Sequence, residues 1–454
     1  MRGRGRRSED SAFALAQLFG PEEAVAERCD GGGAIDAPRE ARHLRAGPAP
    51  GAGVSERFPM SLAHGRPYLA IPGPSVMPDA VLAAMHRASP NIYEGDLIDM
   101  VDGMIPDLRR VARTEGHVAI YISNGHGAWE AALANTVAPG ERVLICATGR
   151  FGHGWAEMAQ GLGIEVEVLD FGRKTPVEAD RVSEALRARP VKAVLMVHTD
   201  TSSSLRSDVA EVRRAVDEAG QGALLMVDCI ASLGCDPYEM DLWGADVTVT
   251  GSQKGLMVPP GLGFVFFSDR AAEVRRAMPR VSRYWDWGPR ADPEMFYQYF
   301  GGTAPTHHLF GLRAALDLIH AEGIEAIWAR HATLARAIWA AAEVWGEGGP
   351  LTLNVAEPRH RSHAVTALRL GTPHAARLRE WTARAAGVTL GIGLGMSEEG
   401  DPKGQGYFRF GHMGHVNAHM ILGLLGTVEA GLAALDIPHA PGGVSAAAKV
   451  IAEA

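Results

Sequence analysis

The sequence predicts an α/β fold, in which a large domain built on parallel strands is followed by a smaller C-terminal α+β domain. Short apolar runs alternate with helical stretches rich in Ala, Arg and Glu, and this alternation is typical of α/β proteins. A long helical pattern from Gly311 to Trp345 is expected to link the two domains, and residues 351–454 show mixed strand and helix patterns. The predicted strands of the large domain are Arg142–Ala147, Glu165–Leu169, Ala193–Val197, Leu224–Val227 and Val247–Thr250.

Length and composition are those of a soluble globular protein. The chain has 454 residues, of which 46% are hydrophobic and 21% charged, and this is enough for a large core and more than one domain. Its 44 basic and 53 acidic side chains leave a net charge of −9, which argues against a nucleic-acid partner. Because no run of about 18 apolar residues occurs, no membrane span is predicted.

The cysteines and histidines predict neither disulfides nor a metal site. The cysteine spacing matches neither a disulfide framework nor a zinc site, which fits a reducing compartment, and we expect a cytoplasmic protein. The pairs His307–His308 and His412/His415 lack carboxylate or cysteine ligands at helical spacing. The cysteines concerned are Cys29, Cys146, Cys229 and Cys235.

The amino-terminal segment differs in composition from the rest. Residues 1–62 contain an Arg/Gly-rich start, scattered acids and a Gly/Pro/Ala-rich stretch from Ala46 to Gly53, and are predicted to be a disordered extension. The apolar stretch Ala12–Phe19 is followed by acidic residues, so it is a poor signal or transit peptide, and Met60 is an alternative start. We place the large domain at 63–325 and the small domain at 326–454.

Lys254 is the most informative single residue. It lies in a Gly/Pro-rich connection between two apolar, strand-like runs, Val247–Thr250 and Phe264–Phe267, and therefore near the core. Burial lowers the pKa of an amine and leaves it able to condense with an aldehyde. The pattern favours a Schiff-base lysine, with pyridoxal phosphate as the aldehyde, over a surface lysine in a loop.

Two further features lie at predicted strand ends upstream of this lysine. The apolar run Ala223–Val227 ends in Asp228, and α/β sheets bind ligands at the carboxyl ends of their strands. A carboxylate there suits the pyridinium nitrogen of pyridoxal phosphate, and a residue that only caps the next turn has the same pattern. Residues 118–133 predict a strand, a turn containing Gly125 and Gly127, and a helix, whose first amides would form a phosphate cup.

With these features in this order, the chain resembles the class V, fold-type I aminotransferases, in particular the serine–glyoxylate and alanine–glyoxylate enzymes. The resemblance runs from Ile71-Pro-Gly-Pro-Ser-Val-Met-Pro78 to Phe408-Arg-Phe-Gly-His-Met-Gly414, and Gly251-Ser-Gln-Lys-Gly-Leu-Met257 is its most specific segment. It implies a mostly parallel, seven-stranded-type sheet, pyridoxal 5′-phosphate as cofactor and a homodimer. The implied reaction is transamination between a small amino acid, serine or alanine, and a small 2-oxo acid, glyoxylate or pyruvate.

The resemblance also implies roles for individual residues. Lys254 matches the Schiff-base lysine and proton shuttle, and Asp228 matches the pyridinium partner. Arg409 matches the arginine that binds the substrate carboxylate, for which a planar, two-pronged donor has the right shape, and Gly73 is assigned to the substrate as well. Thr303 matches the residue that reaches the phosphate in the neighbouring subunit. The other cofactor positions are Asn124, Gly125, His126, Thr201, Gln253 and Phe151, which would stack on the ring with Trp155 as its rival.

Three places depart from the family pattern. Ser204 stands where relatives carry a glycine, and it must avoid a positive φ or accept strain. Residues 88–96 differ from the segment that borders the substrate entrance in relatives. Phe300 replaces a tyrosine that lies near the phosphate in the alanine–glyoxylate enzymes. These differences bear on the amino donor rather than on cofactor binding.

Two neighbouring activities stay open at this point. One is that of a pyridoxamine–pyruvate aminotransferase, and the other is that of a pyridoxal-phosphate lyase on the same fold, since fold alone does not select the substrate. A cysteine desulfurase is disfavoured because no cysteine follows Lys254. A non-catalytic homologue would be expected to lack Lys254, Asp228 or Arg409, and all three are present.

Overall fold

The structure is a computed structural model that describes residues 61–454. The expectations for residues 1–60, including the disordered extension and Cys29, lie outside the described residues. Among residues 61–454, no helix is both long and apolar enough to cross a membrane.

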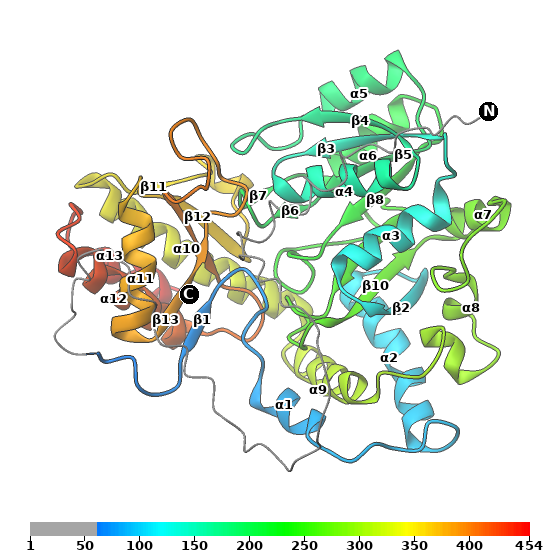
Figure 1. Cartoon of the computed structure of the whole chain (residues 1–454), viewed down its shortest axis with the longest axis horizontal. Helices are drawn as coiled ribbons and strands as arrows, with labels where there is room; N and C mark the ends of the chain where they lie inside the picture. The colour runs from blue at the N-terminus through cyan, green and yellow to red at the C-terminus, as the bar shows by residue number, and fades with distance from the viewer. Residues whose placement is uncertain (1–60) are drawn as a thin grey trace, which may run out of the picture. The chain divides into compact units, whose positions relative to one another are not determined.

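The larger sheet has seven strands (Figure 1). All neighbouring strands run parallel except β10, which is antiparallel to both of its neighbours. Each of the five predicted strands is confirmed to within one residue. The strand order is β2 (His117–Ser123), β10 (Gly261–Phe267), β9 (Val247–Gly251), β8 (Leu224–Asp228), β5 (Ala193–Val197), β3 (Arg142–Ala147) and β4 (Glu165–Asp170).

Helices cover both faces of this sheet, which is why its central strands are continuous apolar runs. Alternate residues of one strand enter different cores: Val194 of β5 packs on one face, and Leu195 on the other. One face is covered by α2 (Asp96–Ala112), α5 (Ala179–Ala188), α6 (Val209–Glu218) and α9 (Thr306–Glu322). The other face is covered by α3 (Gly125–Thr136), α4 (Arg150–Gly161) and α7 (Asp269–Ala277).

The smaller sheet has five strands and its own core. Its strands are antiparallel except for β1, which pairs in parallel with β13 (Figure 1). β1 lies within the residues expected to form the large domain, yet it belongs to this C-terminal sheet, and the domain limits themselves stay predictions. The strand order is β1 (Tyr68–Ala70), β13 (Val388–Ile392), β14 (Tyr407–Gly411), β12 (Val365–Arg369) and β11 (Thr352–Leu353), with α11 (His374–Ala386), α12 (Ala418–Ala434) and α13 (Gly443–Ala452) packed around them.

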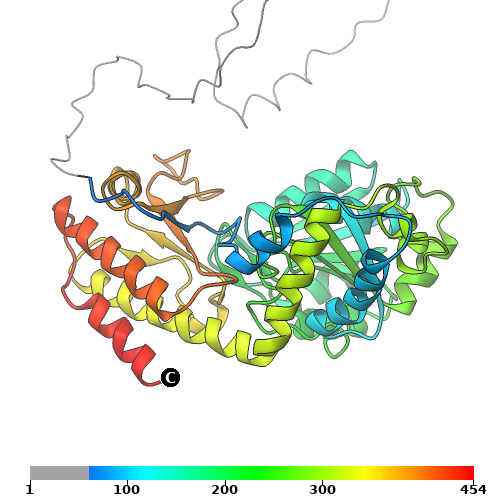
Figure 2. The same cartoon turned by 90° about the horizontal axis from the view of Figure 1, so that it is seen from below.

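The long helical pattern from Gly311 to Trp345 forms two helices rather than one. Gly323 has a φ of 86°, which ends α9 and leads into α10 (Ile324–Glu347). The start of α10, with Ile327, packs in the core of the larger sheet, and its later residues, such as Trp345, pack in the core of the smaller one. Figure 2 shows α9 and α10 in succession, in yellow-green and yellow, running from beside the larger sheet to beside the smaller one. The predicted link is therefore present, with a bend.

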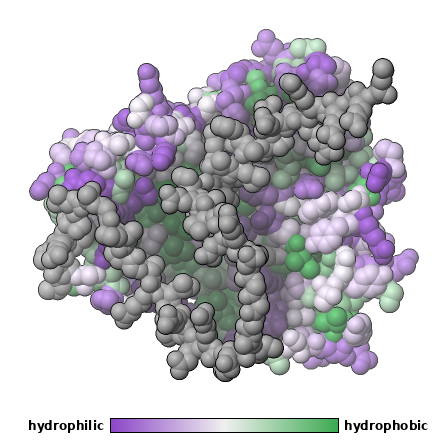
Figure 3. Space-filling model, in the orientation of Figure 1, coloured by the Kyte–Doolittle hydropathy of each residue, from purple (hydrophilic) through white to green (hydrophobic). Residues whose placement is uncertain are grey.

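The remaining described elements are short. They are α1 (Asp79–Met85), α8 (Gly288–Ala291), β6 (Thr199–Asp200), β7 (Leu205–Arg206) and the 3-10 helices η2 (Phe296–Phe300) and η3 (Pro358–His360). Figure 3 shows hydrophilic residues mainly toward the edges of the face that it presents and hydrophobic ones nearer its centre.

Candidate active site

A pocket lies where the carboxyl ends of β5 and β8 meet the start of α3. Val197 ends β5, Asp228 ends β8 and Gly125 begins α3, and all three line the pocket. This edge is where α/β sheets bind their ligands. Seven residues that the sequence singled out line it together: Gly125, His126, Phe151, Thr201, Asp228, Gln253 and Lys254.

Lys254 follows β9 on a loop that is fastened to residues 72–75. Its Nζ donates to the carbonyl oxygen of Pro72. Ser75 bonds the same loop twice, from its backbone N–H to Gln253 O at 2.8 Å and from its hydroxyl to Lys254 O at 2.8 Å. Burial, and after it the charge of Arg409, lower the pKa of Lys254 to about 8. A larger fraction of this amine is therefore neutral near physiological pH than for an exposed lysine.

Gly73 lies against the same amine. Its φ is 96°, and a Cβ at this position would overlap the end of the Lys254 side chain. Both facts require glycine. The structure therefore places Gly73 beside the predicted reactive lysine, as the sequence-based assignment to the site would require.

Asp228 is almost wholly buried at the end of β8, with 3% of its surface exposed. Its Oδ2 accepts a hydrogen bond from Trp129 Nε1 at 2.9 Å, and its Oδ1 accepts one from the N–H of Ile230 at 2.7 Å. Asp228 therefore both caps the next turn and lines the pocket, so the two interpretations of its pattern are compatible. Burial raises its pKa to about 7, and the two hydrogen bonds counteract part of that rise.

The predicted phosphate cup is the N-terminus of α3. Asn124 caps this helix, because its Oδ1 accepts from His126 N–H at 3.0 Å and from Gly127 N–H at 3.4 Å. The Asn124 side chain thus occupies the position that an anion would take at two of these amides. His126 lines the pocket, and burial together with the charge of Arg150 lowers the pKa of its ring.

The structure distinguishes between the two aromatic side chains that could stack on a cofactor ring. Phe151 lines the pocket at the start of α4. Trp155 is fully buried beneath it, outside the pocket lining, and stacks on Trp129 with centroids 5.8 Å apart and an interplanar angle of 14°. Phe151 is therefore the side chain available to a ring in the pocket.

Arg409 comes from the other sheet. It lies on β14, with 5% of its surface exposed, and burial lowers its pKa to about 10. Its Nη1 donates to Thr201 O at 2.6 Å and its Nε donates to Ile392 O at 2.7 Å. Its Nη2 makes no hydrogen bond with the residues that the structure describes. The smaller sheet thus brings a cation next to the loop that carries Thr201.

Ser204 has a positive φ and is therefore strained, which is one of the two outcomes that the sequence allowed. Its φ is 62°, in the left-handed region, which costs a non-glycine residue about 1–2 kcal/mol. Its Oγ accepts a hydrogen bond from the N–H of Ala367 on β12 at 3.1 Å. A glycine would remove the strain and also this link between the pocket loop and the smaller sheet.

Two of the singled-out positions lie elsewhere. Thr303 is exposed in the loop between η2 and α9, and it does not line the pocket of its own chain. Phe300 is fully buried in the core beneath the larger sheet. Within residues 61–454, no group of three or more His, Cys, Asp or Glu side chains is arranged to hold a metal ion.

The comparisons with known proteins agree with this geometry. A family model described as Aminotransferase class-V matches residues 68–392. The chain belongs to this family. The expected fold class and the expected activity, transamination by an enzyme, are confirmed by this membership and by the relatives.

Three known proteins illustrate the range of named activities among those to which the chain is similar. This class V aminotransferase is 35% identical over 403 residues to the serine–glyoxylate aminotransferase of Methylorubrum extorquens, covering 86% of this chain and 97% of the relative. It is 34% identical over 385 residues to an L-aspartate–glyoxylate aminotransferase of Paracoccus denitrificans, covering 83% and 94%. The crystal structure of a pyridoxamine–pyruvate aminotransferase from Mesorhizobium loti matches with a TM-score of 0.77 and 26% identity, covering 86% and 99%.

Sequence reasoning missed two residues of this candidate site. Trp129 donates to Asp228, and Asp200 is fully buried and accepts from the N–H of Phe151 at 2.9 Å. Ser202 completes the second arrangement by donating its hydroxyl to Asp200 at 2.6 Å. The available signals were a tryptophan one turn after the glycine-rich turn and a carboxylate within the polar run after β5, but neither identifies a partner.

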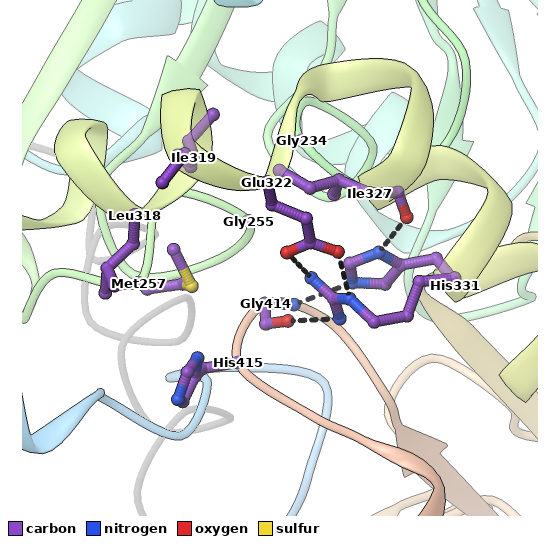
Figure 4. A pocket seen from close by; sticks show the side chains of 12 residues that line it. Gly234, Gly255, Met257, Leu318, Ile319, Glu322, Ile327, His331, Gly414 and His415 are labelled. Atoms are coloured by element: carbon purple, nitrogen blue, oxygen red, sulfur yellow. Dashed lines mark hydrogen bonds and ion pairs between the residues drawn. The ribbon is translucent and has the colours of Figure 1, made fainter.

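A second pocket lies behind the Lys254 loop, at the bend between α9 and α10 (Figure 4). Its charged side chains are paired within the protein. Arg330 donates to Glu322 at 2.6 and 2.9 Å and to the carbonyl oxygen of Gly414 at 3.1 Å. His331 Nε2 accepts from the N–H of Gly414 at 3.0 Å. These contacts fasten the segment that follows β14 to the junction of the two helices.

Proposed function

We propose that this enzyme uses pyridoxal phosphate to transfer an amino group between serine or alanine and a small 2-oxo acid, glyoxylate or pyruvate. One observation carries the proposal. Lys254 and Asp228 line a single pocket, and Arg409 reaches its loop from the other sheet. An amine with a lowered pKa, a buried carboxylate and a carboxylate-binding cation are the groups that amino-group transfer on this cofactor requires.

The pocket fits pyridoxal phosphate on chemical grounds. Besides Lys254 and Asp228 it contains the amide oxygen of Gln253, which is buried and has no hydrogen-bond partner among residues 61–454. At the N-terminus of α3 the helix dipole and the N–H of Gly125, which the Asn124 side chain does not bond, favour an anion such as a phosphate. The residues proposed to hold the cofactor are Lys254, Asp228, Phe151, Thr201, Gln253 and, for its phosphate, Asn124, Gly125 and His126.

The bound cofactor supplies an aldehyde that takes up the amino group and a ring that accepts negative charge. In the proposed roles, Lys254 moves a proton as a neutral amine, which its pKa of about 8 permits. Asp228, in its carboxylate form, accepts a hydrogen bond from the ring N–H. Arg409 orients the substrate carboxylate, using Nη2 first because its other two nitrogen groups already donate to backbone carbonyls.

A small substrate is supported by the way in which the site is enclosed. Residues 72–75 lie directly over Lys254 through the hydrogen bonds of Pro72 and Ser75. The relatives act, by name, on serine, aspartate and glyoxylate. Serine and alanine are the donors that best match an enclosed pocket with one carboxylate-binding arginine.

We also propose a homodimer in which Thr303 contributes to the neighbouring site. Thr303 is exposed and does not line the pocket of its own chain, as this role requires. Large hydrophobic side chains of the same region are exposed as well, among them Met295 at 61% and Tyr297 at 45%. The three cysteines of the described chain are free, which is compatible with the cytoplasm as its compartment.

The substrate proposal is tested by product analysis. Purified holoenzyme is incubated with serine, alanine, aspartate or free pyridoxamine, each with glyoxylate or pyruvate, and the amino and oxo products are quantified. Serine or alanine with glyoxylate should give glycine and the matching 2-oxo acid at the highest kcat/KM. Preferential use of free pyridoxamine with pyruvate would instead assign the pyridoxamine–pyruvate reaction.

A further inference from the structure

We propose that Trp129 is the positioning residue for Asp228, and that its indole N–H keeps the carboxylate oriented and ionised toward the cofactor ring. The inference rests on the proposed function, because Asp228 is given its partner there. Nothing in the sequence motifs assigns a role to Trp129.

Among the described residues, one side chain donates a hydrogen bond to the Asp228 carboxylate. Trp129 Nε1 lies 2.9 Å from Asp228 Oδ2, and the only other hydrogen bond to this carboxylate among the described residues comes from the backbone N–H of Ile230. The backbone amide of Ile230 holds Oδ1. By itself it would still allow the carboxylate to turn about that contact, and Oδ2 could take up a proton. The indole N–H therefore controls the second oxygen.

The indole itself is held on three sides. It stacks on Trp155 at 5.8 Å and 14°, meets Phe151 edge-on at 6.3 Å and 67°, and contacts His126 at 4.7 Å and 59°. Trp129 is fully buried and also lines the pocket. Because its neighbours fix the ring, the N–H points at Asp228 without an entropy cost at the moment of binding.

Burial makes this donor important. Asp228 is buried, which favours its neutral form, and the hydrogen bonds from Ile230 and Trp129 oppose that tendency more than the charge of Lys254 does. A protonated carboxyl group no longer attracts the proton of a ring nitrogen. Loss of the Trp129 N–H should therefore increase the neutral fraction of Asp228 near pH 7.

Trp155 provides a matched control. It is also a tryptophan, is equally buried and stacks on the indole of Trp129, but its own Nε1 has no hydrogen-bond partner in the described part of the chain. Trp129→Phe and Trp155→Phe both remove an indole from one aromatic cluster, whereas only the first removes a donor from Asp228.

The test compares both variants with the wild type in two readouts. In the apoprotein, the carboxyl stretch of Asp228 is followed by infrared difference spectroscopy over pH and assigned by its loss in Asp228→Asn. In the holoenzyme, the dissociation constant of pyridoxal phosphate is measured. Trp129→Phe should move the Asp228 titration to higher pH and weaken cofactor binding roughly tenfold or more, whereas Trp155→Phe should leave both near wild type.

Equal behaviour of the two variants in both readouts would overturn the role of Trp129. If the wild type binds no pyridoxal phosphate, the proposed function fails, and the infrared titration still decides whether Trp129 controls Asp228. If Trp129→Phe does not fold, Trp129→3-benzothienylalanine keeps the shape and replaces the N–H with sulfur. The same shift and loss of affinity are then expected, and wild-type values would refute the proposal.

Discussion

Arg409 on the smaller sheet donates from Nη1 to the carbonyl oxygen of Thr201 at 2.6 Å, on the loop that follows β5 of the larger sheet. The residue that we assign to the substrate carboxylate thus also joins the two sheets at the pocket. Substrate affinity and the placement of Thr201 are expected to depend on the same side chain.

Arg409→Ala should therefore lower kcat/KM for both amino and oxo acids by about a hundredfold, because a charge-assisted contact with the substrate carboxylate is lost. KM should change more than the dissociation constant of pyridoxal phosphate. Arg369→Ala is the control, since Arg369 lies on the neighbouring strand β12 and pairs with Glu398 at 2.8 Å. Steady-state kinetics equal to wild type in Arg409→Ala would mean that another group holds the carboxylate.

Lys254→Ala should abolish turnover and the visible absorbance of the bound cofactor, because no other amine lines the pocket among the described residues. Absorbance spectra and product assays of the purified variant provide the measurement. Lys174→Ala, at an exposed position, should behave as wild type. A Lys254→Ala protein that retains both properties would remove Lys254 from its assigned role.

Gly73→Ala should impair activity far more than stability alone explains. Its Cβ would overlap Lys254, and its φ of 96° adds strain. Gly65→Ala separates the two effects, because Gly65 also has a positive φ, 139°, but no atom lies within 4 Å of its added Cβ. Thermal unfolding and kcat/KM are measured for both. Equal activity in the two variants would show that Lys254 tolerates the methyl group.

Two small substitutions of Ser204 should differ in their effect on stability. Ser204→Ala keeps the strained φ and loses the bond from Ala367, so the free energy of unfolding should fall by about 1 kcal/mol. Ser204→Gly loses the same bond but relieves strain of about 1–2 kcal/mol, so its stability should equal or exceed that of Ser204→Ala. Chemical denaturation of both variants measures the difference, and a Ser204→Gly protein less stable than Ser204→Ala would exclude strain at this residue.

The free energy of unfolding of the apoprotein should depend on pH through the ionisation of Asp228. Its pKa in the folded state is raised to about 7 from 3.8, so its contribution is fully present below about pH 4 and is lost as the pH rises through 7. Asp228→Asn removes this dependence. The free energy of unfolding of wild type minus that of Asp228→Asn should therefore decrease between about pH 4 and pH 7, and a flat difference would show that Asp228 ionises normally.

The sequence predicted best what depends on burial alone. The strand Ala193–Val197 is continuous and apolar because both faces of its sheet are covered, and its limits agree with the structure. The sequence pattern placed the glycine-rich turn, Asp228 and Lys254 each after a predicted strand. The fold brings all three to one pocket.

What the sequence did not show depends on distant partners. β1 has only three residues, and its partner β13 lies far along the chain, so no local pattern places it in the smaller sheet. The bend at Gly323 interrupts an apolar pattern that continues on both sides. Trp129 reads as an ordinary helix residue because the carboxylate that it contacts belongs to a strand 99 positions away.

The most direct test of the central claim is a half-reaction of purified holoenzyme, followed by absorbance after serine or alanine is added without any oxo acid. We predict that the visible absorbance of the bound cofactor is replaced by that of pyridoxamine phosphate, and that glyoxylate then restores it. If the original absorbance persists while product accumulates, the enzyme is a lyase on this fold rather than the proposed aminotransferase.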